Sequence, residues 1–342
     1  MSDRFRVGIV GAGGVSQLFH IPLLKKSAYA DVVAIADNDY AKAATLAERS
    51  KIPKYYRDAE KMFADPEIDA VHINTPTNSH MALTLAALEA GKHVLVEKPM
   101  ARKSTEAQRM VQAAKKAGCY LMVGMNLRFR PDVMILHEFV HGGELGTVRV
   151  VRASWLKRKE TWSRSPWLHE SRISGGGVLM DLGLQLLDVC WWTLGKPKIK
   201  RVSAGISKDR LNLRVEDTFT AYFTLHGGAT LQLNATWAYM SDESTAMTVF
   251  SGNKGIAELN PLKITKEIHG NLVNVTPAGP QLKSQTLYNK SFEYELEHFY
   301  NVIGGKAKPM SVPEDSAYIL EAIEAAYKSA SENREVVIGA EE

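Results

Sequence analysis

A glycine-rich turn follows the first apolar segment of the chain. The pattern Gly11-x-Gly13-x-x-Ser16 comes directly after residues 5–10 and leads into a stretch of helical composition. The first glycine permits a tight turn, the second lets the backbone approach a diphosphate, and the third position must be small. Free N–H groups at the start of a helix also suit phosphate oxygens. On its own the motif would also suit a glycine-rich surface turn, and it predicts a dinucleotide site together with the carboxylate described next. The residues expected there are Gly11, Gly13, Gly14 and Val15.

A carboxylate stands at the end of the second apolar segment. Asp37 lies 37 − 16 = 21 residues beyond Ser16. At that place a carboxylate accepts hydrogen bonds from the hydroxyls of the adenosine ribose and repels a 2′-phosphate. We therefore expect NAD as the cofactor and consider NADP the less favoured alternative. Taken alone, Asp37 would also suit a cap for the helix that follows it.

A polar loop follows the next apolar segment, residues 70–74. In open α/β sheets the loops at the carboxyl ends of the strands line the ligand crevice. A turn with Ser79 at the start of the next helix would explain most of these residues without a ligand. Their position nevertheless favours contact with the cofactor. The residues expected at the cofactor are Asn74, Thr75, Pro76 and His80.

Lys98 is the residue best suited to proton transfer. It stands in Glu97-Lys98-Pro99, after the apolar run 93–96. A residue before proline is kept away from helical backbone angles, so the lysine is presented at the edge of the sheet. An amine there can hydrogen-bond a hydroxyl or carbonyl oxygen, and with a lowered pKa it can exchange a proton. A solvated lysine at the end of a strand is the common alternative.

The elements that must position these residues alternate in the first third of the chain. Short, continuously apolar runs predict parallel strands that are buried on both faces, and the segments between them have helical caps. The alternation predicts a doubly wound sheet with right-handed crossovers. After about residue 124, closely spaced strands with glycine turns predict a mostly antiparallel sheet, with two helices near the end of the chain. We expect domains at 1–124 and 125–342.

Composition narrows the classes of function. The net charge of 42 − 38 = +4, without a long basic run, gives no sign of a nucleic-acid partner. Two cysteines are too few for a disulfide framework and lack the spacing of a zinc site, so no metal is expected. No signal-peptide pattern and no run of about 18 apolar residues is present, so we expect no membrane association and a cytoplasmic location.

The order of these motifs resembles the glucose-fructose oxidoreductase/inositol dehydrogenase/MocA family. Beyond the motifs above, residues 124–129, 175–181 and 215–218 match its pattern, and the similarity covers nearly the whole chain. The resemblance implies a Rossmann-like domain followed by an α/β domain with a large open-faced sheet. It places Glu97, Lys98 and Asn126 at the cofactor. In such families the open face commonly packs against another subunit, so a homodimer or homotetramer is expected. Apolar residues of the alternating strands, such as Leu231, Leu233 and Trp237, are expected at that face.

The family pattern also implies a set of catalytic residues. After three glycines it has an aspartate, a histidine four residues later and an aspartate three beyond. This chain has Asp181, Gln185 and Asp188 at these positions, which share one helix face. Glutamine can donate and accept hydrogen bonds but cannot titrate. We expect Lys98 as the acid/base, Asp181 as its partner or a substrate anchor, and Gln185 as a substrate hydrogen-bonder. Arg128, Trp162 and His169 are further candidates for substrate contact, although loop packing would explain Trp162 and His169 nearly as well.

The reaction that fits best is hydride transfer between nicotinamide and a sugar, cyclitol or related polyol. Two alternatives stay open at this point. Some relatives in the family perform redox-assisted glycoside cleavage, and the family also includes a regulator that binds dinucleotide without turnover. Lys98 and Asp181 favour an enzyme, while Gln185 in place of the histidine keeps the regulator open.

Overall fold

The computed structural model describes residues 4–159, 166–208, 211, 213–279 and 282–339. The chain forms two compact units. The first contains residues 1–126 together with 289–318, and the second contains 127–288 together with 319–342. The later part of the chain therefore returns to complete the first unit, which no sequence pattern indicated. The domain limits 1–124 and 125–342 remain a proposal.

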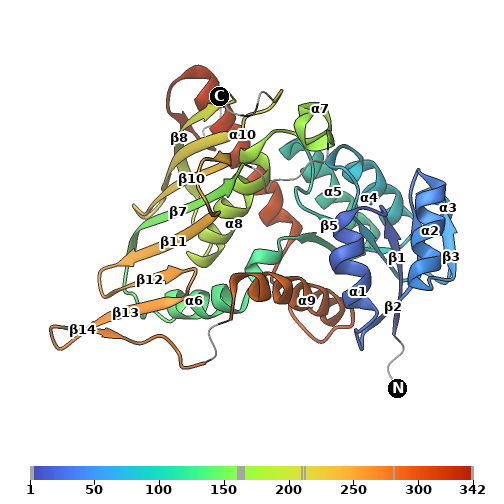
Figure 1. The fold of residues 1–342 in the computed structure, drawn as a ribbon, viewed down its shortest axis with the longest axis horizontal. Helices are drawn as coiled ribbons and strands as arrows, with labels where there is room; N and C mark the ends of the chain where they lie inside the picture. The colour runs from blue at the N-terminus through green and yellow to red at the C-terminus, as the bar shows by residue number, and fades with distance from the viewer. Residues whose placement is uncertain (1–3, 160–165, 209–210, 212, 280–281, 340–342) are drawn as a thin grey trace. The chain divides into compact units, whose positions relative to one another are not determined.

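The first unit is built on a six-stranded parallel sheet in the order β3-β2-β1-β4-β5-β6 (Figure 1). All four residues of β4 are buried, as a strand covered on both faces requires. The doubly wound parallel sheet expected from the sequence is confirmed. The strands are β1 (Phe5–Val10), β2 (Ala30–Ala36), β3 (Lys54–Tyr56), β4 (Ala70–Ile73), β5 (His93–Glu97) and β6 (Leu121–Gly124). The helices between them are α1 (Ile21–Leu24), α2 (Tyr40–Ser50), α3 (Ala59–Phe63), α4 (His80–Glu89) and α5 (Ser104–Ala117).

Short turns complete the connections of this unit. A π-helical turn, Ser16–His20, precedes α1, and single 3₁₀ turns span Thr77–Ser79 and Asn126–Phe129. The cap of α2 is Asp39, whose side chain accepts the N–H of Lys42 at 3.1 Å. Asp37 is therefore not the cap of this helix, and the alternative that explained it without a ligand is wrong.

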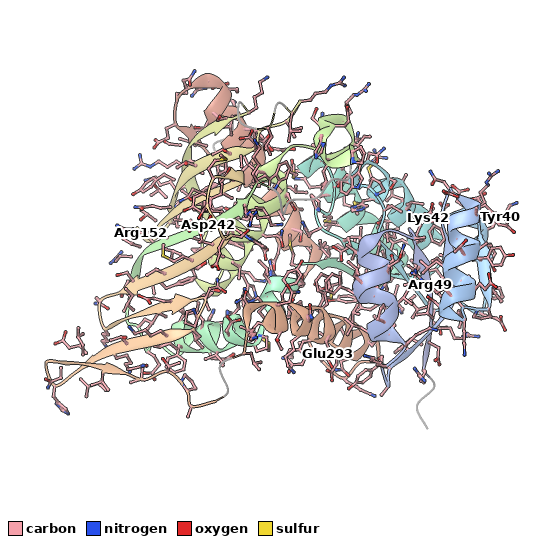
Figure 2. All side chains as sticks on the ribbon, viewed as in Figure 1. Tyr40, Lys42, Arg49, Arg152, Asp242 and Glu293 are labelled. Atoms are coloured by element: carbon pink, nitrogen blue, oxygen red, sulfur yellow. The ribbon has the colours of Figure 1, made fainter. Side chains whose placement is uncertain are left out.

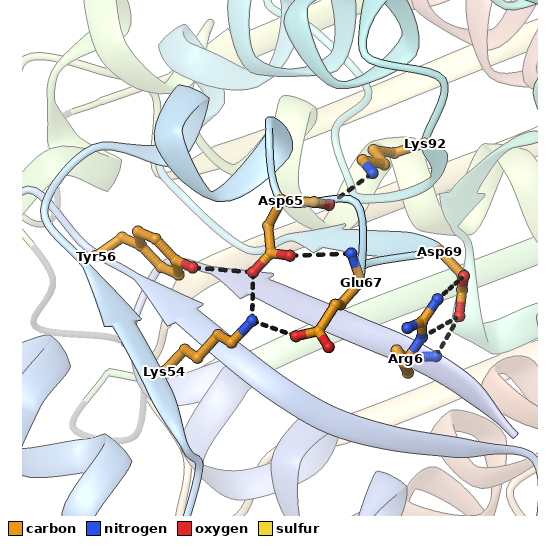
Figure 3. A network of polar contacts seen from close by, with 7 residues as sticks. All are labelled: Arg6, Lys54, Tyr56, Asp65, Glu67, Asp69 and Lys92. Carbon is orange, nitrogen blue, oxygen red and sulfur yellow. Dashed lines mark hydrogen bonds and ion pairs between the residues drawn. The ribbon is translucent and has the colours of Figure 1, made fainter.

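A network of charged groups joins the outer strand β3 to the connection between α3 and β4 (Figure 3). Asp65 accepts hydrogen bonds from Lys54 at 2.7 Å and from the Tyr56 hydroxyl at 3.1 Å. The Lys54 ammonium is the main cause that lowers the pKa of Asp65 to about 2. Lys92, which is buried, donates to the backbone carbonyls of Asp65 and Ile68. These contacts fix the connection between α3 and β4.

The second unit contains a nine-stranded sheet in the order β14-β13-β12-β11-β7-β10-β9-β8-β15. Among its described pairs, β10 and β7 are parallel and the others antiparallel. The mostly antiparallel sheet is confirmed. Its strands are β7 (Val148–Arg158), β8 (Ile199–Ser207), β9 (Thr218–Leu225), β10 (Thr230–Tyr239), β11 (Thr245–Gly252), β12 (Gly255–Leu259), β13 (Lys263–Ile268), β14 (Asn271–Asn274) and β15 (Val336–Val337).

The helices of the later part of the chain include the most apolar segment. They are α6 (Pro131–His141), α7 (Ser171–Ser174), α8 (Leu184–Thr193), α9 (Ser284–Ile303) and α10 (Pro313–Glu332), with a 3₁₀ turn at Pro166–His169 and a π-helical turn at Leu179–Gly183. Among the described residues, the stretch Ser171–Thr193 is long and apolar enough to cross a membrane, but 83% of its most apolar window is buried inside the fold. It therefore fits a core helix.

The two faces of the second sheet differ in character. Figure 1 shows α6 and α8 on one side of it. Leu231, Leu233 and Trp237 are at most 2% exposed, so they belong to the core. The expectation that they lie on the open face is wrong. The pairing register places Tyr222, Gln232 and Arg152 side by side on the other face. Tyr222 is 44% exposed, and Arg152, marked in Figure 2, is exposed as well. The open face is thus more polar than expected.

Candidate functional site

The glycine-rich turn has the geometry that its composition predicts. Gly11 has a φ of +96°, and a Cβ built on it would lie 2.6 Å from the carbonyl oxygen of Asn74. Only glycine fits there. A Cβ at Gly14 would have no heavy atom within 4 Å. The chain thus leaves an open space beside the start of the helical segment, where N–H groups lack carbonyl partners within the helix.

Ser16 has a definite role that a packing argument misses. Its hydroxyl donates to the Gly11 carbonyl at 2.5 Å and accepts the side-chain amide of Asn74 at 3.0 Å. The serine therefore ties the end of β4 to the turn after β1. A glycine or alanine at this position would make neither bond.

Asp37 lies against the same turn. One of its carboxylate oxygens accepts the N–H of Ala12 at 2.7 Å, and the other accepts the N–H of Asp39 at 2.9 Å. The ammonium of Lys42 is 3.8 Å from the carboxylate. Asp37 is therefore held at the carboxyl end of β2, next to the glycine-rich turn, as a ribose-binding carboxylate must be.

The residues present fit a dinucleotide. The open space at Gly14 would be filled by any larger side chain. Two buried side-chain oxygens near the end of β4 have no hydrogen-bond partner among the described residues. They are the amide oxygen of Asn74 and the hydroxyl oxygen of Thr77. Buried polar atoms of this kind usually have a partner, which a bound molecule can supply. Asn74 thus combines a structural bond to Ser16 with an acceptor that remains available.

His80 is placed differently from the other residues of this loop. It is 1% exposed, and its two ring nitrogens lie 2.8 Å from the carbonyl oxygens of Thr75 and Pro99. Burial is the largest influence on this imidazole and lowers its pKa. His80 therefore joins the loop after β4 to the backbone that follows Lys98. Thr75 shares a hydrogen bond with Ser79 at 2.7 Å, and Pro76 is exposed.

Lys98 follows the end of β5 and is half-buried. The Lys98–Pro99 peptide bond is cis. The Lys98 backbone N–H donates to the buried carboxylate of Glu97 at 3.2 Å. A Cβ at Gly124, on the neighbouring strand β6, would come within 3.3 Å of that carboxylate. The glycine thus leaves the room that Glu97 occupies.

Asn126 is buried at the end of the first unit. Its side-chain amide donates to the hydroxyl of Ser291 on α9 at 2.8 Å. Ser291 was not among the predicted residues, because its distance along the chain hides the contact. This bond attaches the returning helix to the segment after β6.

Asp181 and Gln185 lie together in the second unit. The Gln185 amide donates to the backbone carbonyl of Asp181 at 2.9 Å. The indole N–H of Trp237 is 3.3 Å from an Asp181 carboxylate oxygen. Trp237 therefore orients this carboxylate, although the sequence indicated it only as a surface residue. Asp181 is half-buried and Gln185 is buried.

The three glycines before Asp181 make room for a buried carboxylate. A Cβ at Gly177 would lie 2.1 Å from the Glu216 carbonyl oxygen, and one at Gly176 would lie 2.0 Å from the Tyr327 hydroxyl. One oxygen of the Glu216 carboxylate accepts the N–H groups of Gly177 and Leu179 and the hydroxyl of Tyr327. Burial raises the pKa of Glu216. This motif is structural: it fixes the backbone that leads into Asp181.

Arg128 and Asp188 form a buried ion pair. Two guanidinium nitrogens of Arg128 bind the two Asp188 oxygens at 2.8 and 2.5 Å. The exposed fractions of the side chains are 0% and 2%. The Arg128 fork is therefore directed at this carboxylate, and Asp188 is a buried structural residue.

The remaining candidates lie in the segment before α7. His169 is half-buried in the turn Pro166–His169, and Trp162 lies outside the described residues. Among the described residues, no group of three or more histidine, cysteine, aspartate or glutamate side chains could hold a metal ion. The main candidate site residues are thus divided between the two units. Asp37, Asn74 and Lys98 lie in the first unit, and Asp181 and Gln185 lie in the second.

The comparisons with known proteins agree with this geometry. The chain is 30% identical to D-glucoside 3-dehydrogenase of Escherichia coli (strain K12), with 96% of each chain covered. It is also 30% identical to trans-1,2-dihydrobenzene-1,2-diol dehydrogenase of Mus musculus, covering 95% of this chain and 96% of that protein. The crystal structure of GenD2 from gentamicin A biosynthesis, in complex with NAD, has a TM-score of 0.86 at 25% identity, covering 99% of this chain and 98% of that one.

Two family descriptions cover most of the sequence. Residues 5–125 match the oxidoreductase family with an NAD-binding Rossmann fold, and residues 137–338 match the C-terminal α/β domain of the same family. The resemblance drawn from the motifs is confirmed. This chain belongs to the glucose-fructose oxidoreductase/inositol dehydrogenase/MocA family and is an NAD-binding oxidoreductase.

Proposed function

We propose that this enzyme is an NAD-dependent dehydrogenase that oxidises a secondary hydroxyl of a sugar or a related cyclic polyol. The observation that carries the cofactor preference is Asp37, held against the glycine-rich turn by the N–H of Ala12 at 2.7 Å. The names of the relatives support the substrate class. A D-glucoside and a trans-dihydrodiol are both rings with neighbouring hydroxyl groups.

The nicotinamide, when bound, accepts the hydride, and the protein must take up the hydroxyl proton. We assign this proton to Lys98. Its backbone is held on one side by Glu97 and on the other by the bond of His80 to Pro99. A lysine amine can serve as an acid/base when its surroundings lower its pKa. The family pattern supports this role.

For the substrate we propose Asp181 as an anchor for hydroxyl groups and Gln185 as a second hydrogen-bonder. The indole N–H of Trp237 orients the Asp181 carboxylate, and the Gln185 amide bonds to the Asp181 backbone carbonyl beside it. An aspartate that is already oriented can accept two sugar hydroxyls with little loss of side-chain freedom. Arg128 is better explained as the partner of Asp188 than as a substrate contact.

A substrate screen tests the proposed function. The enzyme is incubated with NAD and a panel of D-glucosides, cyclitols and dihydrodiols, and formation of reduced nicotinamide is followed by its absorbance. We expect turnover of at least one ring with neighbouring hydroxyls, and loss of turnover in Lys98→Met with unchanged affinity for NAD. Tight NAD binding without turnover of any member of the panel would favour a dinucleotide-sensing regulator. Cleavage of a glycoside without net nicotinamide reduction would favour the redox-assisted glycosidase.

We further propose a homodimer or homotetramer that forms through the open face of the second sheet, in a cytoplasmic enzyme. Tyr222 and Met247 are 44% and 47% exposed there, which supports a contact with a second copy. Light scattering at micromolar concentration tests this, and a monomer would contradict it.

A further inference from the structure

Four buried polar groups of the first unit form a continuous chain, of which the proposed function uses Glu97 alone. Glu97 lies at the end of β5, His20 ends the π-helical turn, His72 lies in β4 and Tyr300 in α9. Their exposed fractions are 8%, 0%, 0% and 1%. Glu97 Oε1 is 3.1 Å from His20 Nε2, the Nδ1 atoms of His20 and His72 are 2.8 Å apart, and His72 Nε2 is 2.7 Å from the Tyr300 hydroxyl.

The two ends of this chain determine its direction. At one end, a carboxylate oxygen of Glu97 accepts the Lys98 backbone N–H and the other lies 3.1 Å from His20 Nε2, which places the proton of this ring on Nε2. At the other end, burial raises the pKa of Tyr300 well above its usual range, so the phenol keeps its proton. Among the described residues, the Tyr300 hydroxyl has one hydrogen-bond partner, His72 Nε2, and it therefore donates to that atom.

The tautomer of each histidine follows. Because His72 Nε2 accepts, the proton of this ring lies on Nδ1 and is donated to Nδ1 of His20. Burial and the neighbouring His20 lower the pKa of His72 well below its usual range, which keeps the ring neutral. Three hydrogen bonds thus use three protons. One more proton on Nδ1 of His20 would place two protons between the rings and break that bond, and one on Nε2 of His72 would turn the Tyr300 hydroxyl from donor to acceptor.

The chain ends beside Lys98. Glu97 accepts a hydrogen bond from His20 on Oε1 and one from the Lys98 backbone N–H on Oε2. The orientation of the carboxylate therefore determines where that N–H lies. Rotation of Glu97 would lose one of these two bonds.

We propose that His20, His72 and Tyr300 are positioning residues that hold Lys98 through the carboxylate of Glu97. The proposal rests on the role assigned to Lys98 above. Tyr300 is three hydrogen bonds away from Glu97. A change at Tyr300 should nevertheless alter the position of the Lys98 backbone and lower the catalytic rate.

Among the described residues, two other buried titratable side chains lie close enough to feel the charge of Glu97, namely His80 and Glu295. Glu295 of α9 is fully buried, and neither of its carboxyl oxygens has a partner among the described residues. Burial and the charge of Glu97 raise its pKa well above the usual range, so it is a neutral acid in the folded protein. Aromatic rings enclose the histidines as well: Phe292 lies edge-on to His20, and Phe299 lies edge-on to His72. The chain is therefore insulated from water and from other negative charge on α9.

The first experiment reads the tautomers by nitrogen NMR of the full-length protein at neutral pH. The signals are assigned by their loss in His20→Gln and His72→Gln. We expect His72 as the Nδ1–H tautomer and His20 as the Nε2–H tautomer. An Nε2–H tautomer at His72, or a doubly protonated His20, would overturn the directed chain.

The second experiment compares Tyr300→Phe with Tyr120→Phe. Both changes remove one hydrogen-bonded phenolic hydroxyl from the first unit. Tyr300 is buried and Tyr120 is half-buried, and the Tyr120 hydroxyl donates to the Ser311 carbonyl and not to the chain. Tyr300→Phe should shift the backbone amide signal of Lys98 and lower kcat about three- to tenfold, without a change in KM or in NAD affinity. Tyr120→Phe should change none of these.

The amide signal separates this proposal from the proposed function, because it needs no turnover. If no substrate is oxidised but the Lys98 signal shifts in Tyr300→Phe alone, the positioning stands and the assigned reaction fails. If the Lys98 signal and kcat respond equally to both variants, or to neither, the positioning proposal is wrong.

Discussion

Glu295→Gln should change how the stability of the first unit depends on pH. Glu295 carries a fully buried carboxyl group on α9, and neither of its oxygens has a hydrogen-bond partner among the described residues. Burial, and next the charge of Glu97, raise its pKa well above the ordinary value of 4.5. The folded protein therefore keeps a proton on Glu295 in a pH range where the unfolded chain has lost it.

The sign and size of the effect follow from proton linkage. A group that binds its proton more tightly in the folded state favours folding at low pH, and this contribution is lost as the pH rises toward the folded pKa. The loss has a limiting slope of about 1.4 kcal/mol for each pH unit. Glutamine cannot titrate, so the variant lacks this slope. At pH values above the ordinary carboxyl pKa, the stability of the variant relative to the wild type should therefore rise with pH, by at most about 1.4 kcal/mol for each pH unit.

Hydrogen exchange in β4, read by mass spectrometry, measures the stability of the first unit directly. Tryptophan fluorescence would not, because all six tryptophans lie between residues 155 and 237. Glu293→Gln is the matched control, since Glu293 is exposed on the same helix (Figure 2). A constant difference between Glu295→Gln and the wild type at all pH values would show that Glu295 titrates normally, and the reasoning from burial would be refuted.

Three further predictions concern the cofactor turn and the core. Asp37→Ser should weaken the binding of NAD and strengthen the binding of NADP, because Lys42, 3.8 Å from the Asp37 carboxylate, can then attract a 2′-phosphate. Calorimetric titration with both cofactors measures this, and an unchanged preference would contradict it. Gly11→Ala should abolish NAD binding, because its Cβ would lie 2.6 Å from the Asn74 carbonyl oxygen; binding within tenfold of the wild type (about 1.4 kcal/mol) would count against it. Asp188→Asn should destabilise the second unit by about 3–5 kcal/mol, because it leaves the Arg128 charge buried, and a urea midpoint equal to that of the wild type would show otherwise.

The local patterns of the sequence were sufficient to predict the first sheet and the candidate cofactor residues at the carboxyl ends of its strands. Continuous apolar runs gave the parallel strands, and the glycine spacing led to the turn at Gly11. The position of Asp37 after β2 is likewise a local property. Each of these features depends on neighbours within one β-α-β unit, where local sequence and tertiary structure agree.

Contacts between distant segments could not be predicted in this way. Nothing in the sequence of α9 indicates that Ser291 binds Asn126 or that Tyr300 binds His72. Leu231, Leu233 and Trp237 were assigned to the wrong face, because alternation shows that two faces differ but not which of them a helix covers. The role of the triple glycine also depended on a distant partner, Glu216.

The central claim is that hydride passes from a ring carbon of a sugar or polyol to NAD. The most direct test uses a substrate found in the screen, carrying deuterium on the reacting carbon, and measures deuterium in the recovered nicotinamide by mass spectrometry. We expect one deuterium in each reduced nicotinamide, a lower rate for the deuterated substrate when hydride transfer limits turnover, and no transfer by Lys98→Met. Product formation by the wild type without deuterium in the nicotinamide would contradict it.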